Sequence, residues 1–259
     1  MAIDLGAGRG KGQGRAGLAM IAVAVLAMAA LVAFRFLLPE PVCTAAPTAL
    51  YAVLLDSTSH LSEAQRLDLG NRLRSIAREM PAGARLQFWK VAPTGDDVPT
   101  ALGEPACKPD PNPNEWLQNK SQAQEALHEF DEALRQQIDA ALNAQEQSES
   151  PILESLQAIW LRFLGSDQYD GDVERHLIVA SDLVQNTQAI SFYRGLPMTE
   201  DLQRNTRYQS LRVPLNGTDV TVLYMRHNDG VEPGRLIELW EWVFRDMGAS
   251  LNKVARLTG

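Results

Sequence analysis

The 259-residue sequence predicts an α/β fold, a doubly wound and mostly parallel sheet covered by helices in three layers, preceded by one transmembrane helix. Short apolar runs typical of buried strands alternate with longer amphipathic stretches typical of helices, which favours parallel strands joined by crossover helices. An apolar segment long enough to cross a bilayer lies near the amino terminus. The chain length and the 45% hydrophobic content allow one sizeable core.

The apolar segment covers residues 16–38, AGLAMIAVAVLAMAALVAFRFLL, and no charged residue interrupts it before Arg35. A spanning helix needs about 20 apolar residues, so we expect a transmembrane helix that remains as a signal anchor. A cleaved signal peptide is the alternative, although the apolar region of such peptides usually has only about 7–15 residues.

The tail before this segment, residues 1–15, has three basic residues and one acidic residue. These are Arg9, Lys11, Arg15 and Asp4. Because positive residues stay on the cytoplasmic side, we expect a single-pass inner-membrane protein whose amino terminus is cytoplasmic and whose remainder lies in a bacterial periplasm. Residues 39–47 would form a stalk, and residues 48–255 the folded domain. The net charge of −8 argues against a nucleic-acid partner, which a basic face would attract.

Five strands and four helices are expected in the folded domain. The strands cover residues 50–55, 85–92, 98–102, 176–181 and 219–225, of which the second and third form a hairpin. The helices cover residues 61–80, 114–147, 151–164 and 233–251, and residues 113–147 form a long helical insertion. Ser59 or His60 is expected at the start of the first helix.

Two of the predicted strands are followed directly by an aspartate. Asp56 follows the first strand in YAVLLDSTSH, and Asp182 follows the fourth in HLIVASD. Ligand sites of open parallel sheets lie at the carboxyl ends of the strands, beside the point where the strand order reverses. The two carboxylates are therefore expected at the same edge of the sheet.

This pattern resembles the von Willebrand factor type A family, whose domains have a Rossmann-like fold and hold a divalent cation at a metal-ion-dependent adhesion site. Asp56 and Thr58 match the first and third positions of the family's DxSxS motif, and His60 departs from the fifth. Ser150 before PILESL is similar to the family's Thr-Pro-Leu stretch, and Asp182 to its fourth-strand aspartate.

The resemblance implies magnesium or manganese on Asp56, Thr58, Ser150 and Asp182. Magnesium prefers such oxygen ligands, and His60 suits a hard ion less well than serine. The alternative is that both aspartates are hydrogen-bonded loop ends without a metal.

The function expected is a non-enzymatic interaction module with an unidentified protein partner in a bacterial envelope assembly. One alternative is a metal-dependent ligand-binding domain. Another is a metal-dependent phosphohydrolase that uses Asp56 as the nucleophile. That family requires a second aspartate two residues later, where this chain has Thr58. No serine–histidine or cysteine–histidine nucleophile pair is evident in the sequence.

Two further features suggest contacts. Cys43 precedes the first strand and Cys107 follows the third, so both fall at the edge opposite the aspartates, and we expect a disulfide between them. Phe192, Tyr193 and Arg194 follow Asp182 and are residue types enriched at interfaces. The alternative is that the two aromatic residues pack under their own loop.

Overall fold

The computed structural model describes most of the folded domain and a short part of the amino-terminal segment. The described residues are 20–21, 23–30, 43, 46–56, 61–91, 100–111, 120–142, 149–169, 172–226 and 230–258. The chain divides into two units, Met1–Pro41 and Val42–Gly259. In the first unit, residues 20–21 and 23–30 are helical and exposed. No helix among the described residues is long and apolar enough to cross a membrane. The expected tail 1–15 and most of segment 16–38 lie outside the described residues.

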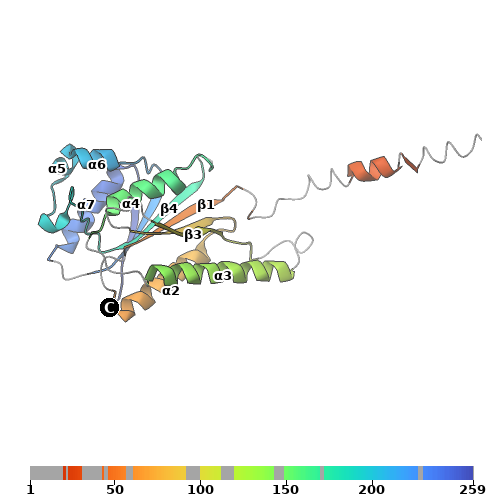
Figure 1. Ribbon diagram of the computed structural model, residues 1–259, viewed down its shortest axis with the longest axis horizontal. Helices are drawn as coiled ribbons and strands as arrows, with labels where there is room; N and C mark the ends of the chain where they lie inside the picture. Colours follow the sequence, from red (N-terminus) through yellow and green to blue (C-terminus); the bar gives the residue numbers. More distant parts are fainter. Residues whose placement is uncertain are drawn as a thin grey trace, which may run out of the picture. The chain divides into compact units, whose positions relative to one another are not determined.

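A six-stranded sheet with the order β3-β2-β1-β4-β5-β6 organises the second unit (Figure 1). Its strands are β1 (Ala49–Leu55), β2 (Arg85–Lys90), β3 (Thr100–Cys107), β4 (Glu174–Ser181), β5 (Thr218–Tyr224) and β6 (Ser250–Arg256). β3 runs antiparallel to β2, and all the other pairs are parallel. This is the doubly wound strand order, with its reversal between β1 and β4. The predicted α/β class and mostly parallel sheet are confirmed.

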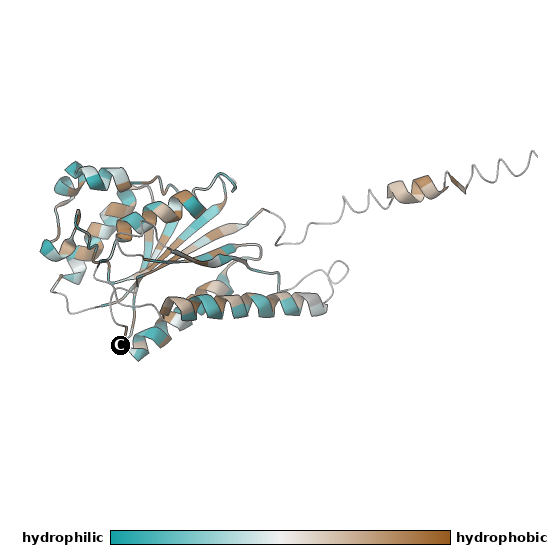
Figure 2. Cartoon of the chain, in the orientation of Figure 1, coloured by the Kyte–Doolittle hydropathy of each residue, from teal (hydrophilic) through white to brown (hydrophobic). Residues whose placement is uncertain are grey.

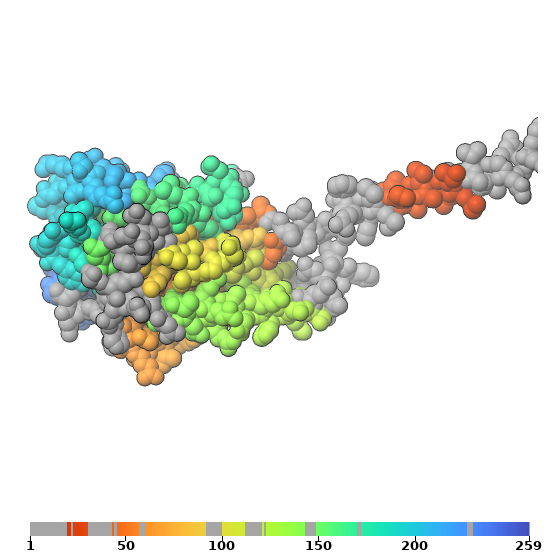
Figure 3. Space-filling model, in the orientation of Figure 1, coloured from red at the N-terminus to blue at the C-terminus, as the bar shows by residue number. Residues whose placement is uncertain are grey.

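Helices cover both faces of this sheet. They are α2 (Glu63–Glu79), α3 (Lys120–Leu142), α4 (Ile152–Ile159), the π-helical turn η1 (Trp160–Leu164), the 3₁₀ turn η2 (Phe192–Arg194), α5 (Thr199–Arg204), α6 (Thr206–Leu211) and α7 (Pro233–Asp246). α2 and α3 lie on one face, and α4 and α7 on the other (Figure 1). Figure 3 shows α3 and β3 side by side at the surface.

The first turn of α2 is fixed by a capping box. The backbone N–H of Gln65 donates to the hydroxyl of Ser62 over 3.2 Å, and the N–H of Ser62 donates to Oε1 of Gln65 over 3.0 Å. The N-cap is therefore Ser62, and the expected cap at Ser59 or His60 is wrong. Of the three positions, only Ser62 combines a hydroxyl with a glutamate or glutamine three residues later, as the reciprocal pair requires.

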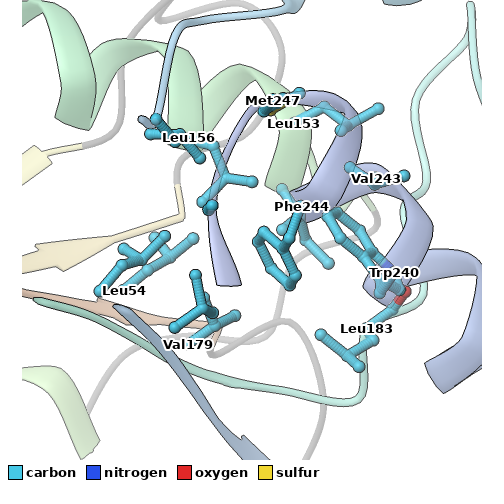
Figure 4. Packing of buried hydrophobic residues seen from close by; sticks show 14 of the residues in the cluster. Leu54, Leu153, Leu156, Val179, Leu183, Trp240, Val243, Phe244 and Met247 are labelled. Carbon is cyan, nitrogen blue, oxygen red and sulfur yellow. The ribbon is translucent and has the colours of Figure 1, made fainter. Parts of the chain in front are cut away.

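Two hydrophobic cores fill the layers on either side of the sheet. Leu50, Ala52 and Leu54 of β1 face α4 and α7, whereas Ala49, Val53 and Leu55 face α2 and α3. β1 is buried on both faces, which explains its continuous apolar run. Figure 4 shows the first core, where Leu54 and Val179 meet side chains of α4 and α7. Figure 2 shows the hydrophobic residues along the central strands, with mixed polar and apolar surfaces on the covering helices.

The last helix is shorter than expected, and a sixth strand follows it. Helix α7 ends at Asp246 rather than at residue 251, and the chain turns at Gly248, whose φ is +84°. A side chain there would also collide with Asn216, because an added Cβ would lie 2.0 Å from its Oδ1. Only glycine fits both constraints, and the turn directs the chain into β6.

The expected disulfide is confirmed. Cys43 and Cys107 are bonded, with their Cα atoms 5.8 Å apart. Cys107 ends β3 opposite Arg85, the first residue of β2, and Arg85 donates to the carbonyl of Cys43 over 2.6 Å. The bond therefore lies at the edge where the parallel strands begin.

Lys108, the next residue, ties this edge to α2. Its Nζ donates to the carbonyl of Ala77 over 2.9 Å and lies 5.3 Å from the ring centroid of Phe130 in α3. Burial lowers the pKa of Lys108, because an ammonium group loses hydration there.

Candidate functional site

The carboxyl ends of β1 and β4 place Asp56 beside Ser181. The register pairs Leu55 with Ala180, so the next residue of each strand falls at the same level. The backbone N–H of Asp56 donates to the carbonyl of Ala180 over 2.9 Å, which continues the ladder by one residue. The main chain therefore fixes the position of Asp56 at the point where the strand order reverses.

Two serine hydroxyls hold the carboxylate of Asp56. Its Oδ2 accepts hydrogen bonds from Ser150 Oγ over 2.8 Å and from Ser181 Oγ over 2.7 Å. The three residues are 3%, 4% and 0% exposed, respectively. Burying a carboxylate is costly unless hydrogen bonds compensate, so these hydroxyls stabilise it where it stands.

Ser150 reaches this position through the loop that follows β4. Its N–H donates to the carbonyl of Asn186, and the N–H of Asn186 donates back to its carbonyl, both over 2.9 Å. Pro151 comes next and leads directly into α4. The reciprocal pair therefore joins the start of α4 to the loop that follows β4.

Asp182 lies one residue beyond Ser181 and is 3% exposed. Its Oδ1 accepts from the N–H of Val184 over 2.9 Å, and Ser181 Oγ accepts from the N–H of Leu183 over 2.8 Å. Leu183 has a φ of +65°, which is unusual for a residue with a branched side chain. Trp240 of α7 donates its indole N–H to the carbonyl of Leu183 over 2.7 Å and so holds the turn.

The structure therefore gathers part of the expected set. Asp56 and Ser150 are in direct contact, and Asp182 lies at the same edge. Thr58 and His60 lie outside the described residues. The sequence reasoning missed Ser181, although it is the small polar residue that ends an apolar strand opposite Asp56.

The oxygen donors at this edge suit a hard divalent cation. Asp56, Ser150, Ser181 and Asp182 offer two carboxylates and two hydroxyls, the ligand types that magnesium and manganese prefer. No group of three or more histidine, cysteine, aspartate or glutamate side chains that could hold a metal ion occurs among the described residues. The hydroxyls would have to supplement the carboxylates, as the chemistry of magnesium allows.

The expected interface residues divide between core and surface. Phe192 is 1% exposed and its ring centroid lies 6.2 Å from that of Trp240, so it packs under the loop and is not available to a partner. Tyr193 is 51% exposed. Arg194 is also exposed, and its Nη2 donates to the carbonyl of Gln188 over 3.1 Å.

Comparison with known proteins finds similarity only among solved structures. No protein-family model matches the sequence, and no curated protein matches it. Proximal thread matrix protein 1 from the mussel byssus is 13% identical over 82% of this chain and 42% of that chain, with a TM-score of 0.43. This chain therefore spans less than half the length of the mussel chain.

Two other structures show similarity of the same order. An aerotolerance-related membrane protein of Bacteroides fragilis is 11% identical over 82% of this chain and 92% of that chain, with a TM-score of 0.39. Manganese-loaded TRAP protein of Plasmodium vivax is 13% identical over 76% of this chain and 62% of that chain, with a TM-score of 0.35. Similarity at these scores establishes neither family nor function.

Proposed function

We propose that the protein is a membrane-anchored, outward-facing interaction module of the von Willebrand factor type A kind, and a non-enzymatic component of a bacterial envelope assembly. The observation that carries the proposal is the hydrogen-bonded cluster of Asp56, Ser150 and Ser181 at the reversal point of a doubly wound sheet, with Asp182 as the next residue of the same edge. Ligands of such sheets bind at this point.

The position of the disulfide supports an outward-facing site. The chain enters the domain at Cys43, at the edge where the parallel strands begin, and Asp56 stands at the opposite end of β1. The seven residues of β1 separate the two edges by about 23 Å. The site therefore lies at the edge opposite the one where the chain enters the domain. If residues 16–38 are the membrane anchor, the anchor leads into the domain at that opposite edge.

The setting of Asp56 favours binding over catalysis. As a phosphohydrolase nucleophile, its carboxylate would need an oxygen free to attack phosphorus. Oδ2 already accepts from two serine hydroxyls, and the residue is 3% exposed. Attack by Oδ2 would require both hydrogen bonds to be rearranged, and attack by either oxygen would require a substrate to reach a residue that is only 3% exposed, whereas a structural role requires neither.

Co-purification of the full-length chain from detergent-solubilised membranes tests the proposal. We expect Asp182→Ala and Asp56→Asn to lose the partners that the wild type retains. Glu132→Ala, an exposed change on α3, serves as the matched control and should retain them. Circular dichroism first confirms that each variant is folded. If folded site variants recover the same partners as the wild type and the control, the site does not mediate binding.

A metal-dependent ligand binder is the second candidate, favoured by the oxygen-rich donors of the site. Calorimetry with magnesium and manganese chloride on the folded chain should then show one saturable binding event, which Asp56→Asn weakens. Absence of binding heat with both ions, together with an unchanged unfolding temperature, would leave the metal-independent interaction module as the function.

A further inference from the structure

A polar hollow lies away from the Asp56 edge, between α2 and the sheet. Its volume is about 290 Å³, and β1, β4, β5 and β6 form its floor. Ligand sites usually begin at about this size. Charged and aromatic side chains line it, chiefly Tyr51, Arg72, Glu79, His176, Asp219 and Lys253.

The floor of this hollow is a row of polar side chains across three strands. The register pairs Tyr51 with His176 and His176 with Asp219, so all three point to the face that carries α2. The rings of Tyr51 and His176 stack with centroids 4.3 Å apart and planes 14° apart. Because stacked rings cover each other's inner faces, the pair offers ring edges to the hollow, against which an aliphatic or peptide group can pack.

Acidic side chains gather at one end of the hollow. Helix α2 connects the carboxyl end of β1 to the amino end of β2, so it runs antiparallel to the strands and its last residue, Glu79, lies near their amino ends. Asp219, the second residue of β5, lies at the same end. Tyr51 has a raised pKa because of burial first, and then because of the carboxylates of Glu174, Asp219 and Glu79.

Basic side chains lie farther along the strands. Arg72 precedes Glu79 by seven residues of helix, which corresponds to about 10 Å. Lys253 of β6 pairs with Thr221 of β5. Thr221 lies two residues beyond Asp219, which places Lys253 about 7 Å farther along the strand direction than Asp219. The hollow is therefore acidic at one end and basic at the other.

The two ends are held apart by contacts outside the hollow. Arg72 pairs with Asp68 and donates to the carbonyl of Arg256 over 3.2 Å. Asp219 Oδ1 accepts from the Asn252 amide over 2.7 Å. Among the ion pairs of the residues that the structure describes, none joins the acidic end to the basic end.

We propose that this hollow binds a short zwitterionic peptide. The terminal ammonium group would lie between Glu79 and Asp219, and the carboxylate near Arg72 and Lys253. A dipeptide in extended conformation spans about 7 Å, and the backbone positions of the two ends lie about 7–10 Å apart along the strands and the helix, so the charged side chains would need to extend only a few ångströms toward it. The stacked rings of the floor would contact its side chains. This site is independent of the function proposed for the Asp56 edge.

Calorimetry of the folded full chain with dialanine tests the proposal. Dialanine should bind, and N-acetyl-dialanine and dialanine amide, which each lack one terminal charge, should bind at least about tenfold more weakly. Asp219→Asn and Lys253→Gln should each weaken dialanine binding by about tenfold. Asp56→Asn, at the other edge, should leave it unchanged.

Two results would overturn the zwitterion site. One is that none of the peptides binds at concentrations up to about 10 mM while the protein is folded. The other is that 1,4-diaminobutane or succinate binds as tightly as dialanine, because a site for a single sign of charge would then explain the lining.

Discussion

The two faces of the sheet differ in how completely they are covered. On the face toward α4 and α7, Val220 and Val222 of β5 are fully buried. On the other face, their neighbour Asp219 is exposed and Thr221 is half-buried. Helix α3 packs beside β2 and β3, and the part of that face between α2 and the remaining strands retains polar side chains. The same strand therefore tolerates very different chemistry on its two sides.

Removing the disulfide should produce the largest effect and should act unequally on the two faces. We expect Cys43→Ser with Cys107→Ser to lower the free energy of unfolding by about 4 kcal/mol, because the bond closes a long loop, with a sequence separation of 64 residues. β3 lies at the sheet edge and is paired only with β2, so its amides and those of α3 should exchange with solvent sooner.

Hydrogen exchange by mass spectrometry checks this, with the wild type before and after reduction as the control. If the amides of α7 lose as much protection as those of α3, the disulfide stabilises both faces of the sheet equally and the prediction is wrong.

A pair of nearly isosteric substitutions on β5 should give the next largest effect. Val222→Thr places a hydroxyl in a fully buried apolar site and should cost about 1–3 kcal/mol. Thr221→Val, one residue away on the open face, should change stability by less than about 0.5 kcal/mol. Urea unfolding measures both. Equal losses would mean that the two faces are equally closed.

The smallest effect should come from the polar link that joins α2 to the end of β6. The N–H of Thr258, and then Arg72, hold the pKa of Asp68 below its ordinary value. Because the folded-state pKa is depressed, the contribution of Asp68 is present above its unfolded pKa of about 3.9 and is lost as the pH falls through the lower folded value.

Asp68→Asn should therefore cost less than about 1 kcal/mol near neutral pH, and this difference should vanish in acid. Urea unfolding at a series of pH values measures it. A difference between wild type and variant that stays constant down to low pH would show that the charge of Asp68 is not responsible.

Hydrophobic patterning was sufficient to locate the central strands of the sheet but not the edge strand β6. β1, β2, β4 and β5 lie within two residues of their predicted ranges, because burial makes them continuous or nearly continuous apolar runs. β6 was missed because an edge strand with few buried side chains has no such run. The alternation of Asp219, Val220, Thr221 and Val222 indicates one open face, but the packing of the helices decides which face it is.

Parallel strands made the meeting of Asp56 and Asp182 at one edge predictable. The contact of Asp56 with Ser150, 94 residues later, was not derivable from periodicity, because it depends on the backbone pair between Ser150 and Asn186. Composition also could not decide between Phe192 and Tyr193. In the structure Phe192, the first residue of the short turn η2, packs beside Trp240, and Tyr193 is exposed.

The bond between Cys43 and Cys107 also has a mechanical consequence. Tension applied to the chain ahead of residue 43 reaches β3 through sulfur at the same moment that it reaches β1 through the backbone. β1 pairs in parallel with β4 from Ala49 and with β2 from Leu50, so a pull along β1 against the opposite end of the sheet loads these hydrogen bonds together, in shear. Under tension applied ahead of Cys43, the strands of such a domain are not expected to separate one at a time.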